Sequence, residues 1–406
     1  MLQRKQYIEA IKPFIDKPVI KAITGVRRSG KSTFLQQIMD ILRSKKVTTD
    51  RIIYINKELV EFDNIKTYLD LHKYVKSIIK NTQKKHYLFI DEIQEIDKWE
   101  KAVASLLAEK MTDIYITGSN ARLLSSELAT LLSGRYIELK MQTFIFSEFK
   151  EIAEKSGKSL SIDKAFDTYI KYGGFPGIHM LEWNDNAVRQ YLQALYSTII
   201  LKDVVVRYNI RDAYMLEKIT EYLISNCGNI TSSNKISDFI KSQKRKVSIE
   251  TVQNYISYLC NALFAYQIKR YDIKGKRILE SLEKYFLCDV GFRFATIGYS
   301  PDSISGQLEN VVLLELLSRG YHVNIGKINE LEVDFIAEKG AEKLYLQVCS
   351  TLKDNKVIDR EYKSLENINN HFPKIVLSLD EGFDTSYKGI RWFNLKNFLL
   401  NPDFKG

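Results

Sequence analysis

The sequence contains few cysteines and no long apolar run, and both absences narrow the class of protein. Its four cysteines, Cys227, Cys260, Cys288 and Cys349, form no C-x-x-C pair, and its five histidines are dispersed without metal-ligand spacing. This pattern argues against a disulfide framework or a zinc site and predicts a cytoplasmic protein. No run of about 18 uncharged apolar residues occurs, so no membrane span is expected. Residues 1–10 also lack the apolar core of a secretion signal.

The length and the net charge of the chain limit the number of domains and the kinds of partner that we expect. A chain of 406 residues exceeds what one hydrophobic core usually supports, so two or three domains are expected. Apolar residues make up 45% and charged residues 27%, as in an ordinary globular protein. The net charge of +10 permits binding to nucleic acid or to an acidic surface. A lysine-rich composition gives the same charge without any partner, so charge alone leaves both interpretations open.

The most informative stretch is Gly25-Val26-Arg27-Arg28-Ser29-Gly30-Lys31-Ser32, which has the G-x-x-x-x-G-K-S spacing of a phosphate-binding loop. An apolar run at 19–24 predicts a strand before it, and 33–39 predicts the start of a helix after it. Glycines let the backbone curl so that N–H groups converge on phosphate, and the helix N-terminus adds partial positive charge. We expect Gly25–Thr33 to bind the nucleotide, with Lys31 reaching the outer phosphates and Ser32 binding magnesium.

Two carboxylates end a second buried strand. Four large apolar residues at 87–90 precede Asp91 and Glu92, as in a parallel-sheet strand that is covered on both faces. Such sheets bind ligands at the carboxyl ends of their strands. We expect Asp91 to hold magnesium and Glu92 to orient and deprotonate the attacking water. The next strand, at 114–118, ends in Ser119 and Asn120, and one of these two is expected to sense the outermost phosphate.

An arginine precedes a fifth strand at 136–139. Arg135 has the planar charge that suits a developing phosphoryl charge, so it is a candidate arginine finger. It would act on its own nucleotide or on that of a neighbouring subunit, and the second case requires an oligomer; the alternative is an ordinary surface residue. Strands and helices alternate over residues 1–150, and an extra strand stands between the loop strand and the acidic strand. The predicted fold class is α/β, with a parallel P-loop NTPase sheet.

The middle of the chain is predicted to be helical. Residues 151–210 form a predicted helical lid or linker that contains the tight turn Gly173-Gly174-Phe175-Pro176-Gly177. Over 211–300, three helices precede two strands, which is the order of a winged helix-turn-helix whose third helix enters a DNA groove. Phosphate contacts would come from six basic residues: Lys244, Arg245, Lys246, Lys274, Lys276 and Arg277. The alternative is a protein-docking module whose lysines are merely solvated.

Residues 301–406 predict a nuclease-like α/β domain. A strongly apolar helix at 307–318 carries Glu309, and the strands that follow carry Asp334 and Gln347. This layout matches the metal-binding positions of restriction-type nucleases. Cys349 occupies the position that should hold a lysine, and a thiol cannot supply that positive charge. We therefore expect a degenerate nuclease site in a domain that has lost catalysis.

Taken together, these motifs resemble a large prokaryotic family of AAA-type ATPases with the additional-strand, glutamate-using P-loop core and a C-terminal domain of unknown function. The resemblance covers nearly the whole chain and implies ATP binding with magnesium and ATP hydrolysis, without a settled biological role. It is carried by Thr117-Gly118-Ser119, Leu132-Ser133-Gly134-Arg135-Tyr136, Gly173-Gly174-Phe175-Pro176, Lys202-Asp203-Val204, Lys284-Tyr285-Phe286 with Asp289 and Gly291, and Leu308-Glu309-Asn310 with Glu332-Val333-Asp334-Phe335 and Gln347-Val348.

The preferred interpretation is an ATP-dependent switch or motor in which nucleotide state acts on a partner, DNA or protein, through the basic C-terminal half. One alternative is a slow nucleotide-gated scaffold in which the nuclease-like domain only docks proteins. A third is an active ATP-dependent nuclease, in which Lys343 or Lys353 would supply the missing positive charge from elsewhere in the fold.

Overall fold

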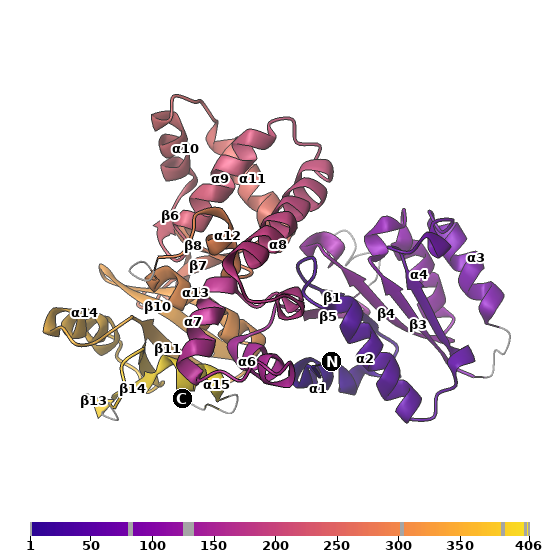
Figure 1. Cartoon of the computed structure of the whole chain (residues 1–406), viewed down its shortest axis with the longest axis horizontal. Helices are drawn as coiled ribbons and strands as arrows, with labels where there is room; N and C mark the ends of the chain where they lie inside the picture. Colours follow the sequence, from indigo (N-terminus) through magenta and orange to yellow (C-terminus); the bar gives the residue numbers. More distant parts are fainter. Residues whose placement is uncertain are drawn as a thin grey trace. The chain divides into compact units, whose positions relative to one another are not determined.

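The structure is a computed structural model that describes residues 2–79, 84–124, 134–300, 304–382, 386–401 and 404. Leu132 and Ser133, which belong to one of the family-like motifs, lie outside these ranges. The chain divides into two compact units, Met1–Gln142 with Asn261–Leu263, and Thr143–Cys260 with Phe264–Gly406. Each unit has its own sheet (Figure 1).

The first unit is built on a five-stranded parallel sheet in the order β2-β3-β4-β1-β5. Its strands and helices are α1 (Lys5–Ile11), β1 (Ile20–Thr24), α2 (Lys31–Ser44), β2 (Ile52–Asn56), α3 (Tyr68–Ile78), β3 (His86–Asp91), α4 (Trp99–Ala108), β4 (Thr112–Gly118) and β5 (Tyr136–Lys140). The predicted parallel α/β core is therefore confirmed. Strand β4 lies between β1 and β3, so an additional strand separates the loop strand from the acidic strand.

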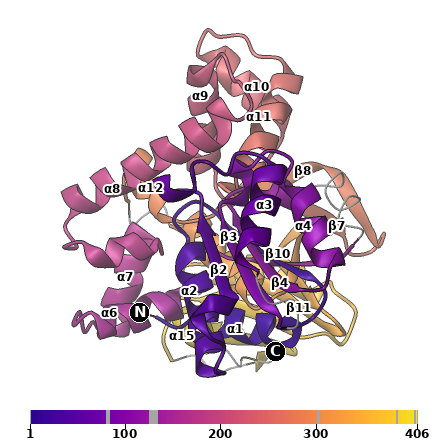
Figure 2. The same ribbon diagram turned by 90° about the vertical axis from the view of Figure 1, so that its right-hand side faces the viewer.

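Helices cover both faces of this sheet, as the alternating pattern predicts (Figure 2). On one face, apolar side chains of α3 and α4, such as Leu71 and Val103, pack on the sheet. On the other face, side chains of α1 and α2, such as Ile11 and Leu35, pack on residues that include Phe89. Covering both faces leaves the edge at the carboxyl ends of the strands as the place where loops can bind a ligand.

The second unit begins with helices. These are α6 (Phe146–Lys155), α7 (Ile162–Tyr172), α8 (Asp185–Thr198), a π-helix (Ile199–Val206), α9 (Ala213–Ser225), α10 (Ser233–Ser242) and α11 (Ile249–Asn261). The hairpin β7 (Ala265–Asp272) and β8 (Arg277–Leu287) follows α11, so the expected order of three helices and a hairpin is present. None of the described helices combines the length and apolarity needed to cross a membrane.

The hairpin also belongs to a nine-stranded sheet in the order β13-β14-β12-β11-β10-β9-β7-β8-β6. The other elements of this sheet and its surroundings are β6 (Ile230–Thr231), α12 (Gly291–Thr296), α13 (Ser305–Ser318), β9 (His322–Ile328), β10 (Leu331–Lys339), β11 (Glu342–Val348), α14 (Asn355–Glu366), β12 (Lys374–Ser378), β13 (Ser386–Tyr387), β14 (Ile390–Asn394) and α15 (Leu395–Leu400). Strand β7 pairs with β9, so the hairpin continues the sheet of the C-terminal segment.

Candidate functional site

The phosphate-loop sequence forms a tight connection between β1 and α2. Gly30 caps α2 with φ of 101°, a left-handed conformation that favours glycine, and its carbonyl accepts the N–H of Phe34 at 2.9 Å. At Gly25 there is no room for a side chain, because a Cβ would lie 2.3 Å from the carbonyl oxygen of Met141. Both glycines of the motif are therefore required by the backbone, which supports the phosphate-loop interpretation.

Lys31 reaches into this loop toward the tip of β3. Its Nζ lies 3.1 Å from the carbonyl oxygen of Gly25 and 3.3 Å from that of Val26. It also lies 3.5 Å from Oε1 of Glu92, and both side chains are buried. This ion pair brings the loop lysine next to the second of the two acids, Glu92.

Asp91, the last residue of β3, and Glu92, which follows it, are joined through a threonine that the sequence reasoning did not place in the site. The hydroxyl of Thr117, at the end of β4, donates a hydrogen bond to Oδ1 of Asp91. It accepts the backbone N–H of Glu92 at 3.0 Å. Tyr54 on β2 donates to Oδ2 of Asp91 at 3.3 Å, and burial together with the proximity of that carboxylate raises the pKa of Tyr54 to about 12. Three neighbouring strands thus fix the acidic pair.

Glu92 is held as a charged carboxylate in a buried position. It follows the strand in a left-handed conformation, with φ of 54°. Burial favours a higher pKa for its carboxyl group, but the charge of Lys31, the hydrogen bond from Gln94 and the charge of Arg27 outweigh burial and hold the pKa below its ordinary value. The carboxylate is therefore ionised at neutral pH and able to accept a proton.

Several polar atoms around the loop are satisfied by nothing in the described part of the chain. Ser29 Oγ, Ser119 Oγ and Gln94 Oε1 are buried and have no hydrogen-bond partner there. Buried polar groups are normally paired, so these atoms fit a site that accepts a polar ligand. Ser119 and Asn120 follow β4, and both side chains are buried.

For magnesium, the oxygen donors at this edge are the exposed hydroxyl of Ser32 and the buried carboxylate of Asp91. Oxygen donors of this kind suit magnesium, which usually completes its shell with water and substrate phosphate. The described residues contain no cluster of three or more His, Cys, Asp or Glu side chains able to hold a metal by themselves.

Arg135 lies at the opposite edge of the sheet. Strand β5 pairs in parallel with β1, with Tyr136 beside Ile20 and Lys140 beside Thr24, so Arg135 precedes the amino end of β1. The loop starts after Thr24, which is about 13 Å further along the strand at about 3.3 Å per residue. The side chain of Arg135 is exposed, and its action as an arginine finger, on its own nucleotide or on that of a neighbouring subunit, stays a prediction.

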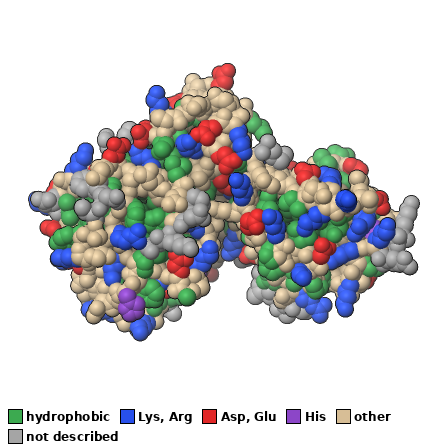
Figure 3. All heavy atoms as spheres, turned by 90° about the horizontal axis from the view of Figure 1, so that it is seen from below, with side chains coloured by type: hydrophobic (Ala, Val, Ile, Leu, Met, Phe, Trp, Pro, Cys, Tyr) green, Lys and Arg blue, Asp and Glu red, His purple; other side chains and the backbone are tan. Residues whose placement is uncertain are grey.

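The six basic residues proposed for DNA are all exposed, in the turn before α11 and in the β7–β8 hairpin. Arg245 stacks over the ring of Tyr214 at 4.1 Å, and α11 also exposes Gln253 and Asn254. The amide side chains of Gln253 and Asn254 are therefore accessible on this helix. Figure 3 shows acidic side chains interspersed with basic ones on the face that it presents.

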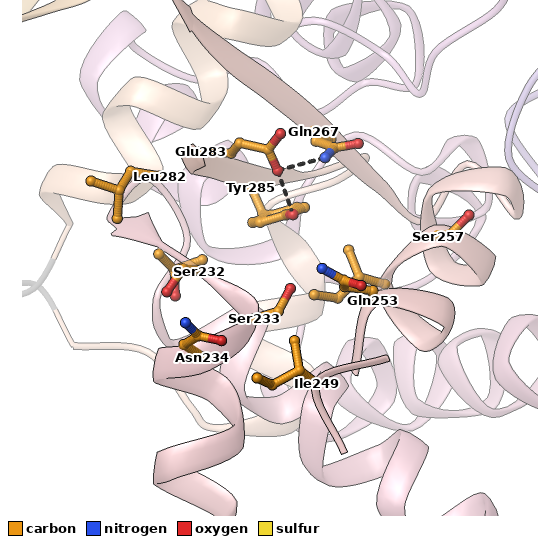
Figure 4. Close-up of a pocket in the computed structure, with 12 residues that line it drawn as sticks. Ser232, Ser233, Asn234, Ile249, Gln253, Ser257, Gln267, Leu282, Glu283 and Tyr285 are labelled. Carbon is orange, nitrogen blue, oxygen red and sulfur yellow. Dashed lines mark hydrogen bonds between the residues drawn. The ribbon is translucent and has the colours of Figure 1, made fainter. Parts of the chain in front are cut away.

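Next to α11 lies a polar cavity of about 420 Å³ (Figure 4). Its lining combines hydroxyl and amide groups from β6, α10, α11 and the hairpin with the single carboxylate of Glu283. That carboxylate accepts hydrogen bonds from Gln267 and, at 2.8 Å, from the hydroxyl of Tyr285. No sequence pattern indicated this cavity, because its lining comes from segments that are separate in the chain.

The predicted nuclease positions do converge. Asp334 Oδ2 accepts the N–H of Val348 at 2.8 Å, and the N–H of Asp334 donates to Gln347 Oε1 at 3.2 Å. Glu309 and Asp334 meet at one cation, the ammonium of Lys284, at 2.8 and 3.6 Å. Sequence reasoning placed Lys284 in a family-like motif but did not connect it with these acids, because β8 lies outside the segment in which we expected the nuclease motif.

The two lysines considered as substitutes do not supply the positive charge beside these acids, and neither does Cys349. Lys343 pairs with Glu338 at 2.7 Å, and Lys353 is exposed. Burial raises the pKa of the Cys349 thiol well above its ordinary value, so the group is neutral. The positive charge near the acids therefore comes from Lys284 instead.

Comparison with known proteins places these features in a family. A family model described as "AAA domain" matches residues 17–150, and one described as "Domain of unknown function (DUF8612)" matches residues 163–303. An uncharacterized protein of Haemophilus influenzae is 37% identical over 400 residues, which cover 98% of this chain and 99% of that protein. One of Methanocaldococcus jannaschii is 34% identical over 384 residues, which cover 90% and 83%.

Among solved structures, a Walker-type ATPase of Pyrococcus abyssi is similar to this chain, with a TM-score of 0.53 and 14% sequence identity. The match covers 73% of this chain and 95% of that one. At this identity the likeness concerns the fold, and it agrees with the parallel P-loop sheet described above.

Proposed function

The chain belongs to one family with these two relatives and has an AAA domain at residues 17–150, and from this premise we propose that it is an ATP-binding and ATP-hydrolysing switch or motor. The observation that carries the proposal is the ion pair of Lys31 with Glu92 inside a glycine-built loop. Lys31, the cation that would bind phosphate, and Glu92, the buried carboxylate that would act as base, lie side by side at the edge of the sheet where P-loop proteins bind nucleotides.

In this proposal each residue has a separate task. The backbone of Gly25–Thr33 and the Lys31 ammonium bind the phosphates, and Ser119 or Asn120 contacts the outermost one. Bound magnesium, held by Ser32 and Asp91, would neutralise phosphate charge. Binding of a triphosphate draws Lys31 away from Glu92, which leaves the carboxylate free to orient and deprotonate water.

The decisive experiment compares nucleotide affinity with steady-state ATP turnover. Lys31→Ala is expected to lose nucleotide binding. Glu92→Gln is expected to keep binding and to lose turnover by about 100-fold or more, the usual contribution of a general base. Glu95→Gln, which changes an exposed carboxylate three residues further on, is the matched control and should leave both unchanged. Unaltered affinity in Lys31→Ala would contradict the proposal.

The same data separate a motor from a slow nucleotide-gated scaffold. If wild-type ATP turnover is no faster than that of Glu92→Gln, the Glu92 carboxylate does not accelerate hydrolysis, and the scaffold interpretation is favoured. A plasmid-nicking assay with magnesium or manganese tests the third candidate, an ATP-dependent nuclease. We expect no nicking, because Lys284 occupies the centre of the acidic positions.

For the partner we propose duplex DNA, which would bind to α11 and the hairpin. The exposed basic residues on both sides of α11 and the amides of Gln253 and Asn254 support this choice. Duplex affinity should fall steeply as salt rises, and ATP turnover should increase when duplex is added. Lys244→Ala with Lys246→Ala should reduce the slope of log affinity against log salt by about 2. Salt-independent or absent binding would remove DNA and favour a protein partner.

A further inference from the structure

The N-terminal segment of the first unit contacts the phosphate loop through one arginine. Arg4 lies ahead of residues 17–150, the part of the chain that the AAA family model matches. Its side chain is buried, and its Nη1 donates to the carbonyl oxygen of Ser29 at 3.4 Å and to that of Gln142 at 2.7 Å. A cation from outside the motif therefore binds the backbone of the loop.

Neighbouring residues hold this guanidinium in place. Its carbon atom lies 4.5 Å from the centre of the Tyr7 ring, and the Tyr7 hydroxyl accepts the N–H of Gln142 at 3.1 Å. On α2, Gln37 donates to the carbonyl oxygen of Leu2 at 2.6 Å and accepts the backbone N–H of Arg4 at 3.4 Å. Because α1, α2 and the segment after β5 all take part, the guanidinium is directed at the loop and not at solvent.

Ser29, whose carbonyl oxygen Arg4 binds, lies in a tight turn of the loop. Its two neighbours have left-handed backbone, Arg28 with φ of 66° and Gly30 with φ of 101°. A side chain disfavours that conformation, so Arg28 keeps it only because the surrounding structure holds it there. Turns of this kind direct successive N–H groups toward one point and form an anion-binding concavity. A contact that fixes the turn therefore also fixes the donors for an anion.

The planar peptide carries the effect of Arg4 from one side of the loop to the other. In a trans peptide the C=O and N–H groups point in opposite directions. The Ser29 carbonyl points at Arg4, so the N–H of Gly30, which belongs to the same peptide, points away from it. A charged donor holds a carbonyl oxygen more firmly than a neutral one, so the guanidinium restrains this peptide from rotating.

We propose that Arg4 is a positioning residue of the nucleotide site, which fixes the Ser29–Gly30 peptide so that the Gly30 N–H donates to a phosphate group of the bound nucleotide. The proposal rests on the ATP-binding function proposed above. It makes the N-terminal segment part of the nucleotide site, although this segment lies outside the phosphate-loop motif. Without the guanidinium the peptide is free to rotate, and the loop offers fewer aligned donors to phosphate.

The test measures ATP affinity, kcat and KM for variants of the full chain. Arg4→Met removes the donors but keeps an apolar stem, and its ATP affinity should fall about tenfold or more, because a hydrogen bond from a charged group is lost. The rise in KM should exceed any change in kcat, because Asp91 and Glu92 are untouched. Arg4→Lys keeps charge and donors and should recover most of the affinity. Lys5→Met, which removes an exposed cation from the same segment, is the matched control and should bind ATP like wild type.

A spectroscopic measurement separates positioning from a purely structural role. With ¹⁵N-glycine labelling, the Gly30 amide signal of wild type should shift when a non-hydrolysable ATP analogue binds, because its N–H enters a hydrogen bond to phosphate. In Arg4→Met that shift should be clearly smaller at saturating analogue. If Arg4→Met does not fold, Arg4→Gln takes its place, and its neutral donor predicts a smaller loss of affinity, about threefold or more.

Two results would overturn the role of Arg4: wild-type ATP affinity in a folded Arg4→Met or Arg4→Gln protein, or a Gly30 signal in that protein that responds to the analogue as in wild type. An equal loss of affinity in Lys5→Met would also overturn it, because general positive charge and not the contact with Ser29 would then explain the effect. Absence of ATP binding by wild type would instead contradict the proposed function itself.

Discussion

At the scale of single residues, the Thr117 hydroxyl couples the two acids of the nucleotide site. It donates to Asp91 and accepts the N–H of Glu92, and its side chain is fully buried. The motif predicted Asp91 and Glu92 because they are adjacent in sequence. The threonine lies 25 residues away from Glu92 on another strand, so no local pattern indicated the contact. Partners across a sheet depend on register, which a single sequence leaves open.

This contact predicts the effect of two substitutions that differ by one group. Thr117→Val keeps the shape but removes the hydroxyl, so the Glu92 N–H loses its partner and Asp91 loses a donor. An unpaired buried group costs about 1–3 kcal/mol, and if that cost falls on the positioning of the base, turnover drops by about ten-fold or more. Thr117→Ser keeps the hydroxyl and should retain most turnover.

The measurement is kcat for ATP together with nucleotide affinity and thermal midpoint. A positioning role predicts that Thr117→Val lowers kcat more than it lowers affinity. If Thr117→Ser and Thr117→Val lose equal activity, the hydroxyl does not position the acids, and packing of the methyl group explains the effect.

At the scale of elements, the turn after α7 is joined to the segment before α12 by one carboxylate. Asp289 accepts the N–H of Gly174 at 2.8 Å and that of Gly291 at 2.9 Å. Gly173 has φ of 79°, and a Cβ there would lie 1.7 Å from Asp289 Oδ1. The glycines were visible in the sequence as a turn. Their partner lies 115 residues away, so the reason for the glycines was not visible.

A matched pair of glycines tests this junction. Gly157 has nearly the same φ, 78°, but a Cβ there would meet no atom of the described residues within 4 Å. Gly157→Ala should cost about 1 kcal/mol for the left-handed backbone alone. Gly173→Ala should cost about 1–3 kcal/mol more, because ψ of −170° places this residue in a region that glycine almost alone adopts, and because the methyl group must displace Asp289 and would lie 2.7 Å from the Gly291 nitrogen. The free energy of unfolding in urea measures both, and equal losses would show that the contact with Asp289 is unimportant.

At the scale of the whole molecule, the sequence predicted elements better than their assembly. The alternation of strands and helices in residues 1–150 predicted the parallel sheet, because local periodicity and a glycine motif specify that fold. The hairpin after α11 was also predicted, but its pairing with β9 was not. Edge strands can pair with any compatible neighbour, and the choice is made by tertiary packing. The convergence of Glu309 and Asp334 on Lys284 went unpredicted for the same reason.

One buried carboxylate predicts how the stability of the second unit depends on pH. Glu315 on α13 is 1% exposed, and its Oε1 accepts a hydrogen bond from Arg319 at 2.7 Å. Its Oε2 has no partner in the described part of the chain. Burial raises the pKa of Glu315 to about 7, against the opposing charge of Arg319. The folded state therefore holds a proton here that the unfolded chain releases at a much lower pH.

The sign follows from proton linkage. Between the ordinary glutamate pKa of about 4.3 and the folded pKa of about 7, the folded state binds more protons than the unfolded state. The free energy of unfolding therefore decreases as pH rises through this range and the contribution is lost above it. Burial of His179 has the opposite effect, because it lowers the pKa of that side chain to about 4, so stability rises with pH up to about 6.5. The contribution of Glu315 must therefore be measured as a difference in the free energy of unfolding between wild type and a variant that cannot titrate at this position.

We expect that difference in the comparison of wild type with Glu315→Gln, which keeps the size and an acceptor for Arg319 but cannot titrate. As pH rises from about 5 to about 7, the free energy of unfolding of wild type should fall relative to that of the variant, whereas the His179 contribution cancels because both proteins carry it. Urea unfolding at half-unit steps of pH measures the divergence. Parallel pH profiles would mean that Glu315 is already ionised in the folded state, so that Arg319 and not burial determines its charge.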